Sequence, residues 1–219
     1  MMKKTLLLLG LIFSSIISSA QIDSTTIYYK NLENKDLKTI CDLANIQVEK
    51  IHCNDTLLRG KVFNFIIKEF KKGIVNSVKN LNITAKKEQI PMVVNGKKMI
   101  YIADYTDKTG FGNSTDSLTI TFAGLLNKKK FKLNIRYPGM GTGVELKGGD
   151  NYLLKQVNSC SNGKIRIPVN TAYPILAYTP PFDTGKKIQS YCMLGEENVL
   201  DWYKKFKVKH YYVIYLEIR

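Results

Sequence analysis

Residues 118–137, Leu-Thr-Ile-Thr-Phe-Ala-Gly-Leu-Leu-Asn-Lys-Lys-Lys-Phe-Lys-Leu-Asn-Ile-Arg-Tyr, decide the fold class of this chain. Leu118, Ile120 and Phe122 alternate with threonines, and residues 131–137 alternate apolar and polar side chains in the same way. A period of two puts one set of side chains on a buried face of a sheet and the other set on its exposed face. The stretch therefore predicts two half-buried β-strands.

Similar patterns lie on both sides of this stretch. Residues 92–103 predict a β-hairpin, because Asn95-Gly96 supplies the positive φ angles of a type I′ turn. Residues 208–218 are apolar on both faces and predict a central strand, while residues 35–45 and 195–206 predict two short helices. Many short strands separated by Gly, Pro and Asn predict a mainly β protein, an antiparallel β-sandwich with one or two short helices.

Residues 61–79 fit two structures. Phe63, Ile66, Ile67, Phe70, Ile74 and Val78 have helical spacing, but the stretch also divides into two strands at Lys71-Lys72-Gly73. Its Phe, Ile, Val and Asn content and its glycine favour a pleated, half-buried surface. We expect a hairpin here and keep a helix as the alternative.

Residues 1–20 have the layout of a secretory signal peptide. Lys3 and Lys4 precede an apolar run, and Ser18-Ser19-Ala20 forms a small-residue end, so we expect cleavage after Ala20. No second apolar run reaches the ~18 residues that a spanning helix requires. We expect a periplasmic or secreted protein that does not span the membrane, with an N-terminal cap segment over 21–58 and the β-sandwich domain over 59–219.

The four cysteines suit an oxidising compartment. An even number of cysteines in an exported chain predicts disulfides, and we expect Cys41–Cys53 and Cys160–Cys192, because each pair is near in sequence. Zinc would require Cys-x-x-Cys-like spacing or histidine partners, and the chain has neither in a suitable arrangement. We therefore expect no metal and no cofactor.

The net charge of the chain is +15, and loss of the two leader lysines leaves +13. Such a charge attracts polyanions and anionic surfaces. Arginines, which make the bidentate contacts of specific base and phosphate recognition, are few: Arg59, Arg136, Arg166 and Arg219. We expect no nucleic-acid partner, and instead an acidic glycan, a lipid head group or an envelope protein.

No set of residues predicts catalysis. His52-Cys53 would need a free, activated thiol, and His210 lies within the predicted last strand. The glycines of residues 139–143 do not have Walker or dinucleotide-loop spacing, and they predict a flexible, bulge-prone connection. We therefore assign no catalytic residue.

Aromatic residues are dense in the C-terminal part of the chain. Exposed Tyr and Trp mark binding surfaces, whereas buried rings fill a sandwich core. We expect most of them to be core and select Tyr178, Phe182 and Trp202 as candidate binding residues.

These features favour an exported, disulfide-tied binding or interaction domain of the cell envelope without catalytic activity. One alternative is a secreted hydrolase acting on an acidic glycan or cell-wall polymer through carboxylates that the sequence does not identify. Another is an inhibitor or immunity-type protein that plugs a partner's active site.

Overall fold

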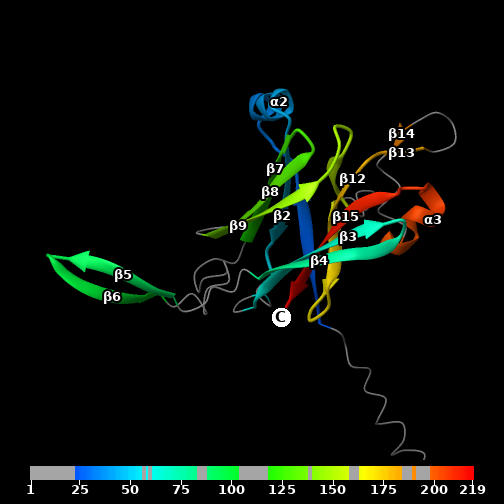
Figure 1. The fold of residues 1–219 in the computed structure, drawn as a ribbon. Helices are drawn as coiled ribbons and strands as arrows, with labels where there is room; N and C mark the ends of the chain where they lie inside the picture. Colours follow the sequence, from blue (N-terminus) through cyan, green and yellow to red (C-terminus); the bar gives the residue numbers. More distant parts are fainter. Residues whose placement is uncertain are drawn as a thin grey trace, which may run out of the picture.

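The computed structural model describes residues 23–55, 58, 61–82, 88–103, 118–137, 140–157, 163–183, 189–190 and 198–219. Two antiparallel sheets form a sandwich (Figure 1), which confirms the predicted fold class. The predicted signal peptide over residues 1–20, Cys160 and Cys192 fall outside the described residues.

Each sheet joins strands that are far apart in the sequence. The first contains, in spatial order, β11 (Lys164–Pro168), β1 (Ser24–Lys30), β2 (Ile46–Cys53), β7 (Leu118–Asn127), β8 (Lys130–Tyr137) and β9 (Met140–Lys147). The second contains β10 (Leu153–Gln156), β12 (Tyr173–Thr179), β15 (His210–Ile218), β3 (Phe63–Lys71) and β4 (Ile74–Asn82).

Three helical segments and two small sheets complete the described chain. The helices are α2 (Lys35–Leu43), the 3-10 turn η3 (Val199–Asp201) and α3 (Trp202–Phe206). The two-stranded sheets pair β5 (Glu88–Val94) with β6 (Lys97–Ala103), and β13 (Phe182–Asp183) with β14 (Gln189–Ser190). Helix α2 confirms the first predicted helix. The second begins later than predicted, at Val199, and residues 191–197 are outside the described part.

The main core lies between the two sheets. Phe122 of the first sheet contacts Phe65 of the second edge to face, and Phe131 stacks on Tyr178 with ring centroids 4.1 Å apart. The alternating apolar residues of β7 and β8 point into this space, as their period of two predicts.

A second core covers the outer face of the second sheet. Trp202 and Phe70 both pack on Tyr211, with centroids 5.0 and 4.8 Å away, and Phe182 packs on Phe206. Because both faces of its sheet are covered, β15 is buried on both sides and has a neighbour along each edge, as its continuous apolar sequence predicts.

The turns resolve the ambiguity over residues 61–79. Lys72 (φ 51°) and Gly73 (φ 78°) join β3 to β4, so this stretch is a hairpin and not a helix. Asn95 (φ 51°) and Gly96 (φ 75°) form the predicted type I′ turn between β5 and β6.

Two expectations require correction. The segment 21–58 is not a cap on the sandwich, because β1 and β2 are hydrogen-bonded strands inside the first sheet. Residues 140–143 are not a flexible connection either, since they belong to β9. Gly141 and Gly143 lie opposite Arg136 and Asn134, and a strand at the edge of a sheet accepts glycine there.

Candidate functional site

A carboxylate and a histidine meet where β3 and β15 pair. Glu69 Oε1 accepts hydrogen bonds from His210 Nε2 at 3.0 Å and from Tyr212 Oη at 3.2 Å. Its Oε2 accepts from Asn76 Nδ2 at 2.5 Å and Ser77 Oγ at 2.9 Å. Burial alone would raise the pKa of Glu69, but these hydrogen bonds and Lys71 outweigh it and lower the pKa to about 2.

This cluster has the residue types of a catalytic pair but not the freedom to act as one. An ionised carboxylate can only accept hydrogen bonds, so Nε2 of His210 carries the hydrogen that it donates to Glu69. The other ring nitrogen, Nδ1, lies 3.1 Å from Tyr152 Oη. Both nitrogens and both carboxylate oxygens are therefore occupied by protein groups. The cluster stabilises the sheet and offers no free proton acceptor to a substrate.

Cys53 and His52 do not form a nucleophilic pair. Successive residues of a strand point to opposite faces, so Cys53 lies in the core while His52 Nδ1 contacts Thr119 Oγ1 at 3.0 Å. Burial and the nearby Asp55 raise the pKa of the Cys53 thiol to about 12. This thiol is protonated at neutral pH and unreactive.

The structure does not contain the expected Cys41–Cys53 disulfide, since both are free, buried thiols. Cys41 lies on α2, beside the start of β2. Cys53 ends that strand, and at about 3.3 Å per residue the two ends of β2 lie roughly 23 Å apart. A disulfide requires Cα atoms about 4.4–6.8 Å apart, so the extended strand prevents the bridge.

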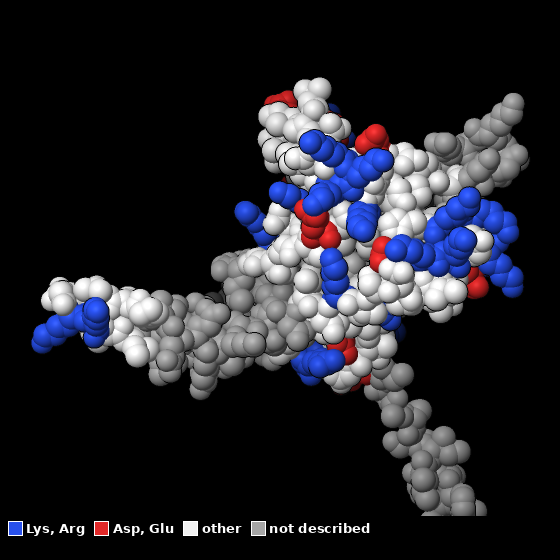
Figure 2. Space-filling model, in the orientation of Figure 1, with Lys and Arg blue, Asp and Glu red and all other residues white. Residues whose placement is uncertain are grey.

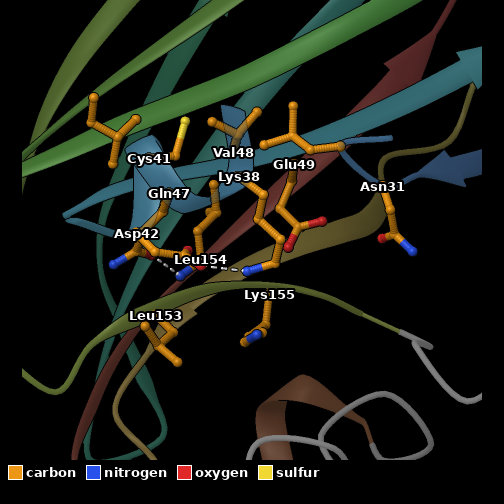
Figure 3. A pocket seen from close by; sticks show the side chains of 12 residues that line it. Asn31, Lys38, Cys41, Asp42, Gln47, Val48, Glu49, Leu153, Leu154 and Lys155 are labelled. Atoms are coloured by element: carbon orange, nitrogen blue, oxygen red, sulfur yellow. Dashed lines mark hydrogen bonds and ion pairs between the residues drawn. The ribbon is translucent and has the colours of Figure 1, made fainter. Parts of the chain in front are cut away.

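A pocket of about 380 Å³ lies where α2 approaches the seam between the sheets (Figure 3). Its walls come from the segment before α2, from α2 itself, from the start of β2 and from β10: Asn31, Leu32, Lys38, Cys41, Asp42, Ile46, Gln47, Val48, Glu49, Leu153, Leu154 and Lys155. The volume is in the range of small-ligand sites.

Two side chains of β2 organise this pocket. Gln47 joins the sheets, because its Nε2 donates to the Tyr152 carbonyl at 3.0 Å and its Oε1 accepts from the Leu154 amide at 2.5 Å. Two residues further, Glu49 Oε2 accepts from Gln156 Nε2 at 2.8 Å. Burial raises the pKa of Glu49, although Gln156 and Lys155 act in the opposite direction.

The rim of the pocket carries a second pair of charges. Lys38 Nζ and Asp42 Oδ2 lie 2.6 Å apart on successive turns of α2, and both side chains are exposed. Such an exposed pair contributes at most about 0.5 kcal/mol to stability. The pocket thus brings two cationic and two acidic side chains together with aliphatic walls (Figure 3).

The hairpin formed by β5 and β6 stands away from the sandwich (Figure 1), and among the described strands these two pair only with each other. All side chains of residues 91–100, which we call the hairpin tip, are exposed. Its large apolar side chains have high exposed fractions: Met92 43%, Val93 67%, Val94 41%, Met99 55% and Ile100 66%. Exposed apolar groups in such density mark a site of interaction.

The hairpin tip is also basic. It contains Lys97 and Lys98 and no acidic residue. Figure 2 shows these charges at the end of the arm, and further lysines and arginines spread over the visible face of the sandwich with few acidic side chains among them.

The three aromatic residues selected from the sequence are not on the surface. Tyr178 and Trp202 are fully buried and Phe182 is 3% exposed. Tyr178 belongs to the main core, while Phe182 and Trp202 belong to the second core. They are packing residues, and the rule that buried rings fill a sandwich core applies to them.

Within the described ranges, no group of three His, Cys, Asp or Glu side chains is arranged to hold a metal ion. None of the helices among the described residues has the length and apolar composition needed to cross a bilayer. No family model, curated protein or solved structure matches this chain.

Proposed function

We propose that this protein is an exported, non-enzymatic binding protein of the cell envelope that associates with anionic lipid headgroups through the hairpin tip. The predicted leader supports a periplasmic or secreted location. The observation that carries the proposal is the combination, on one projecting hairpin, of five exposed apolar side chains with two lysines and no acid.

The apolar side chains favour a lipid surface over an acidic glycan. The register pairs Met92 with Met99 and Val93 with Lys98, so apolar groups occur on both faces of the hairpin. A hydrated glycan offers no apolar environment to such groups. A bilayer interface does, and transfer of the exposed parts of two of these side chains contributes roughly 2–3 kcal/mol.

The lysines supply the preference for anionic lipid. Each cation close to an anionic membrane contributes about 1 kcal/mol. Lys97 and Lys98 lie on opposite faces, so each face carries one. A lysine can lay its aliphatic stem along apolar groups and keep its ammonium at the phosphate level. The tip is too short to span a bilayer, because a spanning strand needs about 9–11 residues.

Sedimentation of the mature chain with vesicles tests this proposal. We expect binding to phosphatidylglycerol–phosphatidylethanolamine vesicles, which high salt weakens, and little binding to phosphatidylcholine. The variant K97S/K98S should bind about 30-fold more weakly, whereas K204S/K205S, with the same net charge but an intact tip, should change binding less than about threefold.

A second variant separates the apolar contribution. V93S/I100S keeps both lysines, and we expect it to bind about 30- to 150-fold more weakly, a loss that does not depend on salt concentration. The proposal would be refuted if the protein bound anionic and neutral vesicles with equal affinity and if neither tip variant changed that affinity. Salt-resistant capture of a single envelope protein instead would favour the inhibitor or immunity-type alternative.

One observation favours a second candidate function, a secreted hydrolase of acidic glycans. Asp42 and Glu49 line the same pocket in different environments, one exposed and paired with Lys38, the other half-buried with a raised pKa. Glycosidases use two carboxyl groups whose environments differ in this way. This candidate would be favoured over the binding function if the protein released reducing ends from polyuronate and if E49Q and D42N each abolished that release.

A further inference from the structure

We propose that the pocket between α2, β2 and β10 is a binding site for a small aliphatic primary amine, whose ammonium pairs with the Glu49 carboxylate. This inference does not depend on membrane binding by the hairpin, which is a separate part of the chain. It rests on which polar atoms of the pocket are already used by the protein and which remain for a ligand.

Most polar groups of the pocket have their partners within the protein. The Gln47 amide is used on both its nitrogen and its oxygen, and Lys38 and Asp42 pair with each other on the rim. These groups position the walls but have little capacity left for a ligand. The remaining acidic side chain of the lining is Glu49.

The Glu49 carboxylate has fewer compensating partners than a buried charge requires. Gln156 donates to Oε2 at 2.8 Å, and Lys155 is the cation that acts on it. Burial still dominates, so its pKa is raised. A carboxylate in this state is stabilised by an added cation inside the pocket, whereas an added anion would be repelled.

The walls of the pocket specify what should carry that cation. Leu32, Ile46, Val48, Leu153 and Leu154 are aliphatic, and no aromatic ring lines the pocket. Quaternary ammonium ligands are usually held by aromatic cages, which are absent from this lining. A primary ammonium can instead donate hydrogen bonds to a carboxylate, and an unbranched aliphatic chain packs against aliphatic walls.

The volume sets the size of the ligand. A pocket of about 380 Å³ accommodates a chain of a few carbon atoms and its hydration water, and it is open to solvent at the rim. The charges of Lys38 and Asp42 on that rim cancel each other, so entry of a cation meets no local net charge there.

Titration calorimetry with butylamine, butanol and butyrate tests the site. We expect butylamine to bind, butanol to bind at least tenfold more weakly and butyrate not to bind. E49Q should lose about 10- to 100-fold in butylamine affinity, the range for one charge-assisted hydrogen bond. E145Q removes an exposed carboxylate outside the pocket, one that pairs with Lys130, and it should leave the affinity unchanged.

The pH dependence gives an independent readout. The charged groups that face Glu49 are Lys155 from β10, Lys38 and Asp42 from α2, and the Tyr29 hydroxyl from β1. Burial raises the pKa of Glu49, so butylamine affinity should fall as the pH decreases through that pKa, and E49Q should lack this fall. The pKa of Tyr29 is also raised, so its hydroxyl stays neutral over this range. The proposal would be overturned if butyrate bound more tightly than butylamine, or if E49Q and E145Q lost equal butylamine affinity. It would also be overturned if butylamine did not bind at 10 mM, since its binding free energy would then be weaker than roughly 3 kcal/mol.

Discussion

Replacing Glu69 with glutamine tests whether the Glu69–His210 cluster is a stabilising element of the sheet. Glu69 is 7% exposed and accepts four hydrogen bonds, two on each oxygen. Glutamine keeps the shape of the side chain but turns one of these oxygens into a donor. Two of the four donors then face an amide nitrogen.

The structure gives the size of the effect. Hydrogen bonds from His210, Ser77 and Asn76 outweigh burial and hold the pKa of Glu69 at about 2, against 4.5 for the unperturbed group. A difference of this size corresponds to about 3 kcal/mol of folding stability at pH 7. Because the folded-state pKa is the lower one, this contribution is complete above about pH 5.5 and is lost as the pH falls from about 5 towards 2.

Urea unfolding monitored by tryptophan fluorescence measures the effect, because Trp202 is the single tryptophan and is fully buried. We expect E69Q to be about 3 kcal/mol less stable than the wild type at pH 7, and the gap to shrink by about 2 kcal/mol at pH 3. E145Q is the control, since Glu145 is exposed. A gap below about 0.5 kcal/mol at pH 7, or one that does not change with pH, would refute this account of the cluster.

Two further predictions follow from the packing. A Cβ on Gly124 would lie 1.9 Å from Phe131 Cζ, so G124A should lose about 1–3 kcal/mol or more of stability in the same urea assay. G141A, whose Cβ would meet its nearest neighbour at 3.4 Å, should stay within about 0.5 kcal/mol of the wild type. Non-reducing peptide mapping should find no peptide joining Cys41 to Cys53, and such a peptide would contradict the extended course of β2.

Local patterns predicted the elements well where one physical rule dominated. The alternation over 118–122 and 131–137 predicted two strands with the correct inward faces. Asn95-Gly96 predicted a turn, because positive φ angles restrict the residues that can occupy it. Residues 61–79 were harder, because apolar residues on both faces of a strand imitate helical spacing. The Phe, Ile, Val and Asn content and Gly73 favoured the hairpin, and the positive φ angles of Lys72 and Gly73 confirm it.

The pocket and the fate of the cysteines depend on tertiary structure, which no local pattern contains. Glu49 and Gln156 are more than a hundred residues apart and meet only because β2 and β10 lie across the seam of the two sheets. Cys41 and Cys53 are near in sequence, but an extended strand between them converts sequence proximity into spatial separation. Sequence distance is a good guide to contact only when a turn lies in between.

The aromatic residues show the same limit. Most of them were expected in the core, but Tyr178, Phe182 and Trp202 were selected as candidate binding residues because exposed aromatic rings mark binding surfaces. Tyr178 lies in the main core, whereas Phe182 and Trp202 lie in the second core, formed by η3, α3 and the outer face of β15. Tyr211 is its centre, flanked by Trp202 and Phe70, and its hydroxyl donates to the Val199 carbonyl at 2.6 Å.

The two features proposed for function are two places where the described chain departs from what stability favours. Among the described carboxyl groups with a displaced pKa, Glu69, Glu145 and Glu217 have partners that lower it, and Glu49 has a raised one. Likewise, most large apolar side chains of the sandwich lie in two cores, and although α2, β4 and a few other positions also expose some, the hairpin tip exposes five within ten residues. At the former, burial outweighs the Gln156 hydrogen bond and the charge of Lys155, and in the latter stability would favour polar residues. A ligand would account for a carboxylate that its protein partners compensate only in part, and a membrane would account for an uncovered apolar tip.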